Sequence, residues 1–120
     1  MGGRDSGTMT QQSSGQQYKV SRSETRHGEN GEHHLVGGQK GSMRLWHKEQ
    51  PSDTADKQPH ANDYETLGYV ISGKVELTLD GQTLTLGEGD SYCVPQGMSH
   101  TYRVLETLTA VEVTTPAQSS

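Results

Sequence analysis

Residues 74–87 read KVELTLDGQTLTLG. Apolar and polar residues alternate on both sides of Asp80-Gly81, and this dipeptide is typical of a two-residue β-hairpin turn. Such a turn pairs Leu79 with Gln82 and sets two apolar cross-strand pairs on one face of the hairpin: Leu77 with Leu84, and Val75 with Leu86. The turn chemistry and the hydrophobic pattern therefore predict the same register.

Short strands are also predicted on both sides of this hairpin, because the apolar residues recur with a period of two. They cover residues 42–48, 66–72, 91–94, 100–105 and 107–113. A polar loop is expected over 50–63, and turns rich in Gly, Pro and Asp separate the later strands. No stretch has the apolar stripe of a helix. The pattern predicts an all-β barrel or sandwich with almost no helix.

Composition divides the chain into two parts. Residues 1–40 hold six apolar residues, whereas residues 64–113 hold twenty-one. We therefore predict a mostly disordered polar tail over 1–31, a folded domain over 32–115 and a loose end over 116–120. Residues 1–40 carry five Lys or Arg against four Asp or Glu, and residues 41–120 carry five against eleven. An acidic domain without a basic stripe argues against nucleic acid or an anionic membrane as a partner.

The location expected for the protein is the cytoplasm. The first ten residues, MGGRDSGTMT, lack the apolar region of a secretory signal, and the longest nearly apolar run is five residues, 67–71. Cys93 is the single cysteine, which excludes an internal disulfide framework. It is expected to be a small buried hydrophobic residue rather than a reactive thiol.

The segment after the hairpin resembles a known family. Gly89, Pro95, Gly97 and His100 follow the pattern G-x5-P-x-G-x2-H, which is similar to the second motif of the cupin superfamily. The first cupin motif, G-x5-H-x-H-x3/4-E-x6-G, can be laid over residues 54–73. The resemblance spans about residues 42–115. It implies a small single-domain cupin, a double-stranded β-helix or jelly-roll β-barrel, that forms a homodimer, with the strand of Trp46 as a place for the subunit contact.

Six of the ten fixed motif positions match, and the first motif is degenerate. The matching residues are His60, Gly73, Gly89, Pro95, Gly97 and His100. Thr54 and Val104 replace a Gly and an Asn of the motifs. Asn62 stands where the second histidine is expected, and Thr66 where the glutamate is expected.

The resemblance implies a metal site that this chain only partly keeps. Metal-dependent cupins supply three His and one Glu to a divalent metal, and here His60 and His100 remain at ligand positions. Fe, Mn, Ni or Zn would need further donors from Asn62 or Glu65, and a β-bulge would have to turn Glu65 inward. The alternative is a metal-free lumen that holds two hydrogen-bonded histidines.

Other residues are candidates for ligand contacts. Tyr102 shares a strand face with His100, so Asn62, Thr66 and Tyr102 are predicted to bind a small molecule in the lumen. Glu112 interrupts the last strand, and an acidic residue in a strand more often faces solvent than a lumen. Trp46 is expected to be a packing residue.

Three functions remain open. The first is a barrel that binds a small polar or carboxylate-bearing molecule, with or without a weakly held metal. The second is a metal-dependent isomerase, lyase or dioxygenase that acts on a small oxygenated substrate. The third is a non-catalytic regulatory or stress-related scaffold whose tail makes the interaction, because a fold alone does not choose among these functions.

Overall fold

The computed structural model describes residues 16–54 and 58–116. These residues form an all-β fold, as predicted, with two short 3-10 helices and no α-helix. The elements are η1 (Arg22–Glu24), β1 (Arg26–His27), β2 (His33–Gly37), β3 (Ser42–Glu49), η2 (Pro51–Thr54), β4 (Glu65–Leu79), β5 (Gln82–Gly87), β6 (Ser91–Val94) and β7 (His100–Thr115). In this part of the chain, no helix has the length and apolar character needed to cross a membrane.

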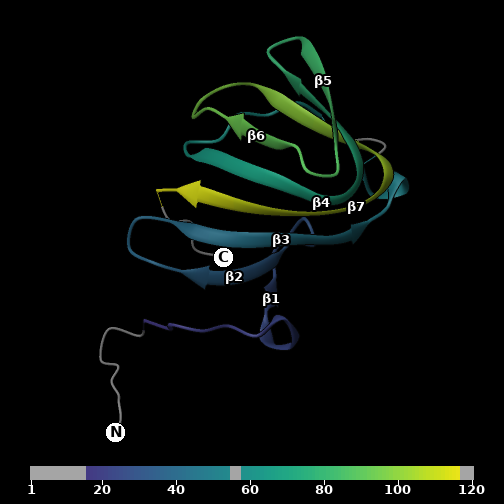
Figure 1. Ribbon diagram of the computed structural model, residues 1–120. Helices are drawn as coiled ribbons and strands as arrows, with labels where there is room; N and C mark the ends of the chain where they lie inside the picture. The colour runs from purple at the N-terminus through teal and green to yellow at the C-terminus, as the bar shows by residue number, and fades with distance from the viewer. Residues whose placement is uncertain (1–15, 55–57, 117–120) are drawn as a thin grey trace, which may run out of the picture.

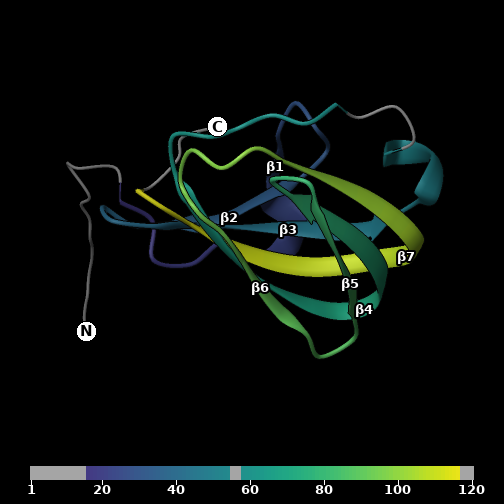
Figure 2. The same cartoon turned by 90° about the horizontal axis from the view of Figure 1, so that it is seen from above.

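The strands form one antiparallel sheet that rolls into a jelly-roll barrel. Their order is β1-β2-β3-β7-β4-β5, and β6 pairs with the first half of β4. The two long strands β4 and β7 lie side by side, and both curve at the same end of the molecule (Figures 1 and 2). This shared curvature turns one face of the sheet inward and leaves the other face outside.

The hairpin has the predicted register. Leu79 pairs with Gln82, and the apolar cross-strand pairs are Leu77 with Leu84 and Val75 with Leu86. Asp80 and Gly81 both have positive φ, 47° and 86°. Two positive values in succession define the type I′ turn that matches the twist of the flanking strands.

Both long strands were predicted as two shorter ones, and that division was wrong. The predicted strands over 66–72 and 74–79 are one strand, β4, and those over 100–105 and 107–113 are one strand, β7. Gly73 has a φ of 93°, and a Cβ at this position would overlap the carbonyl oxygen of Thr107. The glycine therefore bends β4 against β7 without ending it, and the β4–β7 register shifts around the same position.

The core lies inside the roll, on the inward residues of β4 to β7. Its buried apolar side chains are Val70, Val75, Leu77, Leu86, Val94, Val104, Leu108 and Ala110. The buried positions of β7 are all even-numbered and include His100, Glu112 and Thr114, whereas Tyr102 is half-buried and Glu106 is exposed. Polar groups therefore share the interior with the apolar core.

The chain before β3 is more structured than a tail over 1–31 would be. Helix η1 and strand β1 both fall within residues 16–31. Strand β1 pairs with β2, which pairs with β3, so these strands widen the sheet at one edge. Strand β1 has only two residues and pairs with β2. Two residues are too few to show the alternation of apolar and polar residues by which a strand is predicted. The rest of the predicted tail, and residues 117–120 of the predicted loose end, lie outside the described residues.

Candidate functional site

The centre of the barrel holds a carboxylate with four hydrogen-bond donors. Glu112 on β7 is 1% exposed. Its Oε1 accepts hydrogen bonds from Arg44 Nε at 2.7 Å and Trp46 Nε1 at 2.8 Å. Its Oε2 accepts hydrogen bonds from the hydroxyls of Tyr92 at 2.6 Å and Tyr102 at 3.3 Å. An ionised carboxylate only accepts and offers about four lone-pair sites, so this donor set matches its full capacity.

Arg44 balances the charge of Glu112. The two side chains form an ion pair inside the roll, and Arg44 also donates from its guanidinium to the hydroxyl of Tyr64 at 3.3 Å. Burial lowers the pKa of Arg44, but the charge of Glu112 and the contacts with Tyr64 and Glu112 together outweigh burial, so the pKa is raised. The guanidinium carbon also lies 5.7 Å from the ring centres of both Trp46 and Tyr64. Arg44 therefore fixes the positions of the Glu112 carboxylate and of the Trp46 and Tyr64 rings.

Both phenols that contact Glu112 remain protonated at neutral pH. Burial raises the pKa of Tyr92, and the negative charge of Glu112 raises it further. The same two causes, in the same order, raise the pKa of Tyr102. A phenol has one proton, and in both residues that proton is donated to Glu112. The remaining lone pairs on the two phenol oxygens can only accept.

Tyr92 reaches the carboxylate across a glycine. Gly68 on β4 pairs with Tyr92 on β6 and with Glu112 on β7. A Cβ at Gly68 would overlap the end of the Tyr92 ring. The missing side chain therefore lets the ring lie flat over the backbone of β4 and extend to Glu112.

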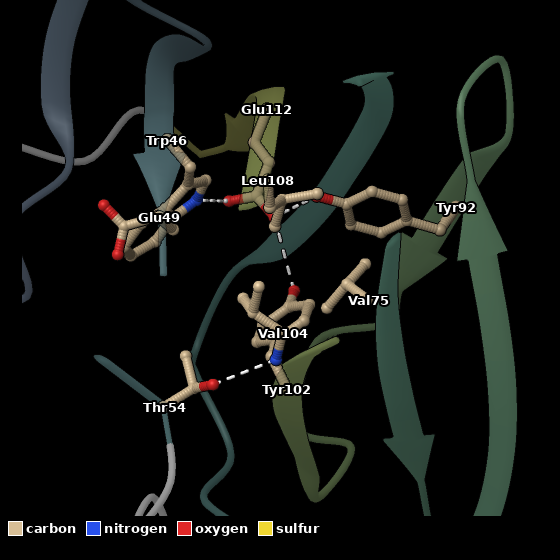
Figure 3. Close-up of a pocket in the computed structure, with 9 residues that line it drawn as sticks. All are labelled: Trp46, Glu49, Thr54, Val75, Tyr92, Tyr102, Val104, Leu108 and Glu112. Carbon is tan, nitrogen blue, oxygen red and sulfur yellow. Dashed lines mark hydrogen bonds between the residues drawn. The ribbon is translucent and has the colours of Figure 1, made fainter. Parts of the chain in front are cut away.

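A pocket opens beside this cluster. Its enclosed volume is about 30 Å³, and the atom-free space is about 390 Å³ when the solvent-open mouth is included. Its wall combines aromatic, aliphatic and acidic side chains from β3, η2, β4, β6 and β7: Trp46, Glu49, Thr54, Val75, Tyr92, Tyr102, Val104, Leu108 and Glu112. Figure 3 shows Tyr92, Tyr102 and Trp46 converging on Glu112 from different sides of the pocket. At one end of the pocket, the hydroxyl of Thr54 accepts a hydrogen bond from the backbone N–H of Val104 at 2.9 Å.

The two histidines at predicted metal positions lie side by side. Their backbones form a β-bridge, and their ring centres are 4.7 Å apart. His60 is exposed, whereas His100 is 3% exposed and its ring lies 5.6 Å from that of Tyr102. Burial lowers the pKa of His100 more than the carbonyl of Met98 raises it, and His60 lowers it further. His100 is therefore neutral at pH 7.

The tautomer of His100 follows from its neighbour. Its Nδ1 lies 3.0 Å from the carbonyl oxygen of Met98. Because a carbonyl oxygen only accepts, Nδ1 carries the proton in the neutral ring, and Nε2 keeps a lone pair. His100 Nε2 is thus an acceptor, as the phenol oxygens of Tyr92 and Tyr102 are.

The other predicted site residues are spread over different environments. Thr66 is buried on the inward face of β4. Asn62 is half-buried, and its backbone carbonyl accepts the N–H of Gly97 at 2.8 Å. Glu65 begins β4, and its carboxylate lies 3.9 Å from Cys93 Sγ. Since β4 pairs regularly with β7 from Glu65 to Val70, no bulge turns Glu65 toward the two histidines.

These positions do not complete the metal site that the resemblance implies. Among the described residues, no three His, Cys, Asp or Glu side chains lie close enough together to hold a metal ion. His60 and His100 supply two imidazoles, whereas tight binding usually needs three or four protein donors. The donor set therefore does not fit a resident three-His-one-Glu metal, and we derive no chemistry through one.

Sequence reasoning misplaced two residues. Glu112 faces the interior rather than solvent, although it lies an even number of positions from His100 and Tyr102 along one strand, and that spacing was the available signal. Cys93 is exposed, not buried, because β6 turns it away from the core. Trp46 was expected to be a packing residue, and it faces inward, lines the pocket and donates a hydrogen bond to Glu112.

Comparison with known proteins identifies the family. Residues 45–115, more than half of the chain, match the family model described as a cupin domain. The chain belongs to the cupin family. The matched range covers β4 to β7 and most of β3, and thus Trp46, His60, His100 and Glu112, while β1 and β2 lie outside it.

Solved structures share this cupin fold at low sequence identity. KdgF from Halomonas is 16% identical with a TM-score of 0.66, over 85% of this chain and 94% of its own. An RmlC-like cupin from Shewanella frigidimarina is 19% identical with a TM-score of 0.67, over 85% and 93%. A variant of Streptomyces PAC13 solved with uridine is 19% identical with a TM-score of 0.66, over 87% and 86%. No curated protein matches the chain in sequence.

Proposed function

We propose that this cupin binds a small, uncharged molecule that carries hydroxyl groups, in the pocket beside Glu112. The observation that carries the proposal is the direction of the hydrogen bonds around Glu112. Tyr92 and Tyr102 each donate their one proton to Glu112, and that carboxylate has its acceptor sites occupied by protein donors. The phenol oxygens therefore offer acceptors to a ligand, and a ligand that donates hydrogen bonds fits them.

His100 extends the same preference toward the end of the lumen. Its Nδ1 proton is directed to Met98, which leaves Nε2 as an acceptor next to Tyr102. Three hydrogen-bond acceptors, the phenol oxygens of Tyr92 and Tyr102 and His100 Nε2, favour a ligand with more than one hydroxyl or N–H group. Each unmatched buried acceptor would cost binding free energy, so the number of ligand donors contributes to specificity.

The apolar part of the wall favours a ring. Trp46 and Leu108 flank the cluster, and Val75 and Val104 line the same space. A pocket with an apolar wall and a few directed polar groups is the usual arrangement for a small-molecule site. A sugar or a nucleoside has both an apolar ring face and several hydroxyl donors, so molecules of that class match this wall.

The charges of the pocket disfavour the carboxylate-bearing ligands that the sequence also allowed. The nine lining residues include two glutamates and no Lys, Arg or His. Arg44 is adjacent but already paired with Glu112. A ligand carboxylate would lose hydration and approach negative charge, which costs free energy. We therefore propose an uncharged ligand rather than a carboxylate-bearing one.

Uridine is a suitable first probe. The PAC13 variant in the structural comparison was solved with uridine, and a second structure of Pac13, with 17% identity to this chain and a TM-score of 0.62, describes it as a nucleoside dehydratase. Uridine is neutral and carries a ring and several hydroxyls. These properties, rather than the shared fold, make it relevant to the pocket described above.

The test uses the one tryptophan of the chain. Trp46 is that residue and lines the pocket, so its fluorescence reports occupancy. We expect uridine or another neutral hydroxylated ring to change the emission of Trp46 saturably. The Tyr102→Phe variant should bind about fivefold to tenfold more weakly, the equivalent of roughly one hydrogen bond, whereas Tyr18→Phe, at an exposed tyrosine, should bind as the parent protein does. Equal affinity in Tyr102→Phe would contradict the role given to the phenol oxygen.

A second candidate function is weak binding of a divalent metal by His60 and His100. The observation in its favour is the orientation of His100, because metal-binding histidines commonly donate their other ring proton to a carbonyl. Titration with Zn²⁺, Ni²⁺, Mn²⁺ or Fe²⁺ should then raise the melting temperature, and His60→Ala and His100→Ala should each remove the shift. If neither variant changes the response, the metal binds elsewhere or not at all.

A further inference from the structure

Histidine side chains from three neighbouring strands lie together on the outer face of the sheet, away from the pocket. His27 on β1 pairs with His33 on β2, and their ring centres are 4.2 Å apart. Trp46 points into the barrel, so Leu45, which pairs with His33, and His47 point outward. The rings of His33 and His47 meet edge to face with their centres 6.1 Å apart. We call His27, His33 and His47 the histidine cluster.

The central ring of the histidine cluster has a defined tautomer. The hydroxyl of Thr25 donates its one proton to the carbonyl oxygen of Arg22 at 2.9 Å. His33 Nδ1 lies 2.9 Å from the same hydroxyl oxygen. That oxygen therefore accepts a hydrogen bond from His33, and Nδ1 carries the proton of the neutral ring. A second proton, taken up in acid, has to add at Nε2, and it makes the ring cationic.

The charges that act on the histidine cluster are positive. Burial lowers the pKa of His33, and the charges of His27, His47 and Arg22 lower it further. Burial also lowers the pKa of His47, followed by the charges of Arg22 and Lys48. Within the described part of the chain, no carboxylate is among the charges that act on these two rings. Protonation therefore sets like charges beside one another without a counter-charge.

The nearest acidic partner on β2 serves the opposite face of the sheet. His34 follows His33 and, by the alternation of a strand, points to the other side. There its Nε2 lies 3.4 Å from Oε2 of the buried Glu32, and its cross-strand neighbours are Arg26 and Arg44. The charge of Glu32 is thus directed away from the histidine cluster.

The segment on one side of the histidine cluster is held by few contacts. Residues 16–31 include η1, which has no buried residue, and β1, which has two exposed residues and pairs with β2 at the edge of the sheet. Figure 1 shows this segment beyond β2, outside the body of the barrel. It also precedes the residues matched by the cupin family, 45–115. We call residues 16–31 the N-terminal strap, and so few contacts are typical of a segment that opens locally at low cost.

We propose that the histidine cluster makes the docking of the N-terminal strap dependent on pH, so that mild acid releases the strap and leaves β2 as the edge of the sheet. Arg22 and His27 belong to the strap, whereas His33 and His47 stay on the sheet, so release separates like charges. The pKa values of His33 and His47 are lowered while the strap is docked. The released form therefore binds more protons below pH 6.5, and the docked fraction falls as the pH decreases.

Hydrogen exchange of the full-length chain at pH 7.5 and 5.5, corrected for the intrinsic rate at each pH, tests the proposal. The protection of strap amides should fall severalfold at pH 5.5, including that of Gly28 N–H, which donates to the Glu32 carbonyl at 2.7 Å. One histidine of ordinary pKa contributes at most about tenfold over this interval. Carboxyl groups ordinarily titrate at about pH 4, so the interval follows the histidines. The β4–β5 hairpin amides and the Trp46 emission should not change, because the barrel stays folded.

Variants connect the response to the histidine cluster. His33→Gln keeps a polar side chain and removes the central titrating group, so its strap should stay protected at pH 5.5. Arg22→Gln removes a permanent charge and should lower the pH of release. The matched control is His60→Gln, which removes a histidine outside the cluster and should respond as the parent protein does. Salt at about 1 M should weaken the response of the parent protein, because it screens charges near the surface.

A second variant covers the case in which His33→Gln loses the strap already at pH 7.5. His47→Gln lies on β3 and leaves the β1–β2 pairing intact, and it should reduce the loss of protection at pH 5.5. Equal protection of the parent strap at both pH values would overturn the proposal. A parent-like response in both histidine variants would also overturn it. Simultaneous loss of protection in the strap and the hairpin would contradict a local release, because the whole barrel would then unfold.

Discussion

Arg44 Nε lies 2.7 Å from Glu112 Oε1 inside the barrel, and this ion pair joins strands β3 and β7. Three neutral donors then complete the hydrogen bonds of the carboxylate. The pair therefore fixes the position of the aromatic rings that line the pocket. Stability and binding depend on the same carboxylate.

Replacing the carboxylate should be costly. Glu112→Gln keeps the size of the side chain but leaves Arg44 without its counter-charge and points amide N–H groups at other donors. We expect a loss of about 3 kcal/mol in the free energy of unfolding, the usual scale for a broken buried ion pair. Urea denaturation measures this loss. Glu106→Gln, at an exposed pair with Lys74, is the control and should change stability little.

Adding one methyl group at Gly68 should displace Tyr92. The new Cβ of Gly68→Ala would overlap the Tyr92 ring, so the ring has to leave Glu112 or the strands have to separate. We expect a loss of about 1–3 kcal/mol in the free energy of unfolding, as for overpacking of a core, together with weaker ligand binding. The control Gly87→Ala has open space at its Cβ and should be nearly neutral. A Gly68→Ala protein as stable as the control would contradict the packing of Tyr92 described here.

Stability should fall at alkaline pH because of the buried phenols. The pKa values of Tyr92 and Tyr102 are raised above the ordinary value of 10.0. Below pH 10 the folded and unfolded chains bind the same phenol protons. Above it the unfolded chain releases them and the folded chain does not, so the free energy of unfolding decreases with rising pH. Ultraviolet titration should show tyrosines that ionise only on unfolding, and Tyr92→Phe/Tyr102→Phe should lose that signal.

The imidazole of His100 should be mostly neutral at pH 7, with its proton on Nδ1. Its pKa is lowered from 6.5, mainly by burial. As pH falls below 6.5 the unfolded chain takes up this proton before the folded chain does, so this contribution to stability is lost with acidification. Nitrogen-15 NMR of labelled histidine distinguishes the tautomers. A ring protonated on Nε2 would contradict the acceptor role given to His100 Nε2 next to Tyr102.

Much of the fold was predictable because local rules agreed with each other. Asp80-Gly81 predicts the turn, and the alternating leucines predict the same register. The predicted pairing of the hairpin therefore agrees with the structure residue by residue. The continuity of β4 was not visible, because Gly73 is typical of a turn until the nearby backbone of Thr107 shows that it bends a strand.

The site was predictable only where a motif marked it. His60 and His100 were identified by spacing, and they lie next to each other. The central carboxylate was not identified, because its burial depends on donors from distant strands. Arg44 and Glu112 are 68 residues apart in the chain, and only the roll of the sheet brings their side chains together.

The most direct measurement compares matched ligands by Trp46 fluorescence. Each pair has one neutral member and one with an added or substituted carboxylate, such as uridine with orotidine and galactose with galacturonate. If the pocket offers acceptors and negative charge, the neutral member of a binding pair should bind at least about tenfold more tightly, a difference of about 1.4 kcal/mol. Tighter binding of the carboxylates, or no change in Trp46 emission with any neutral member up to millimolar concentration, would contradict the proposed function.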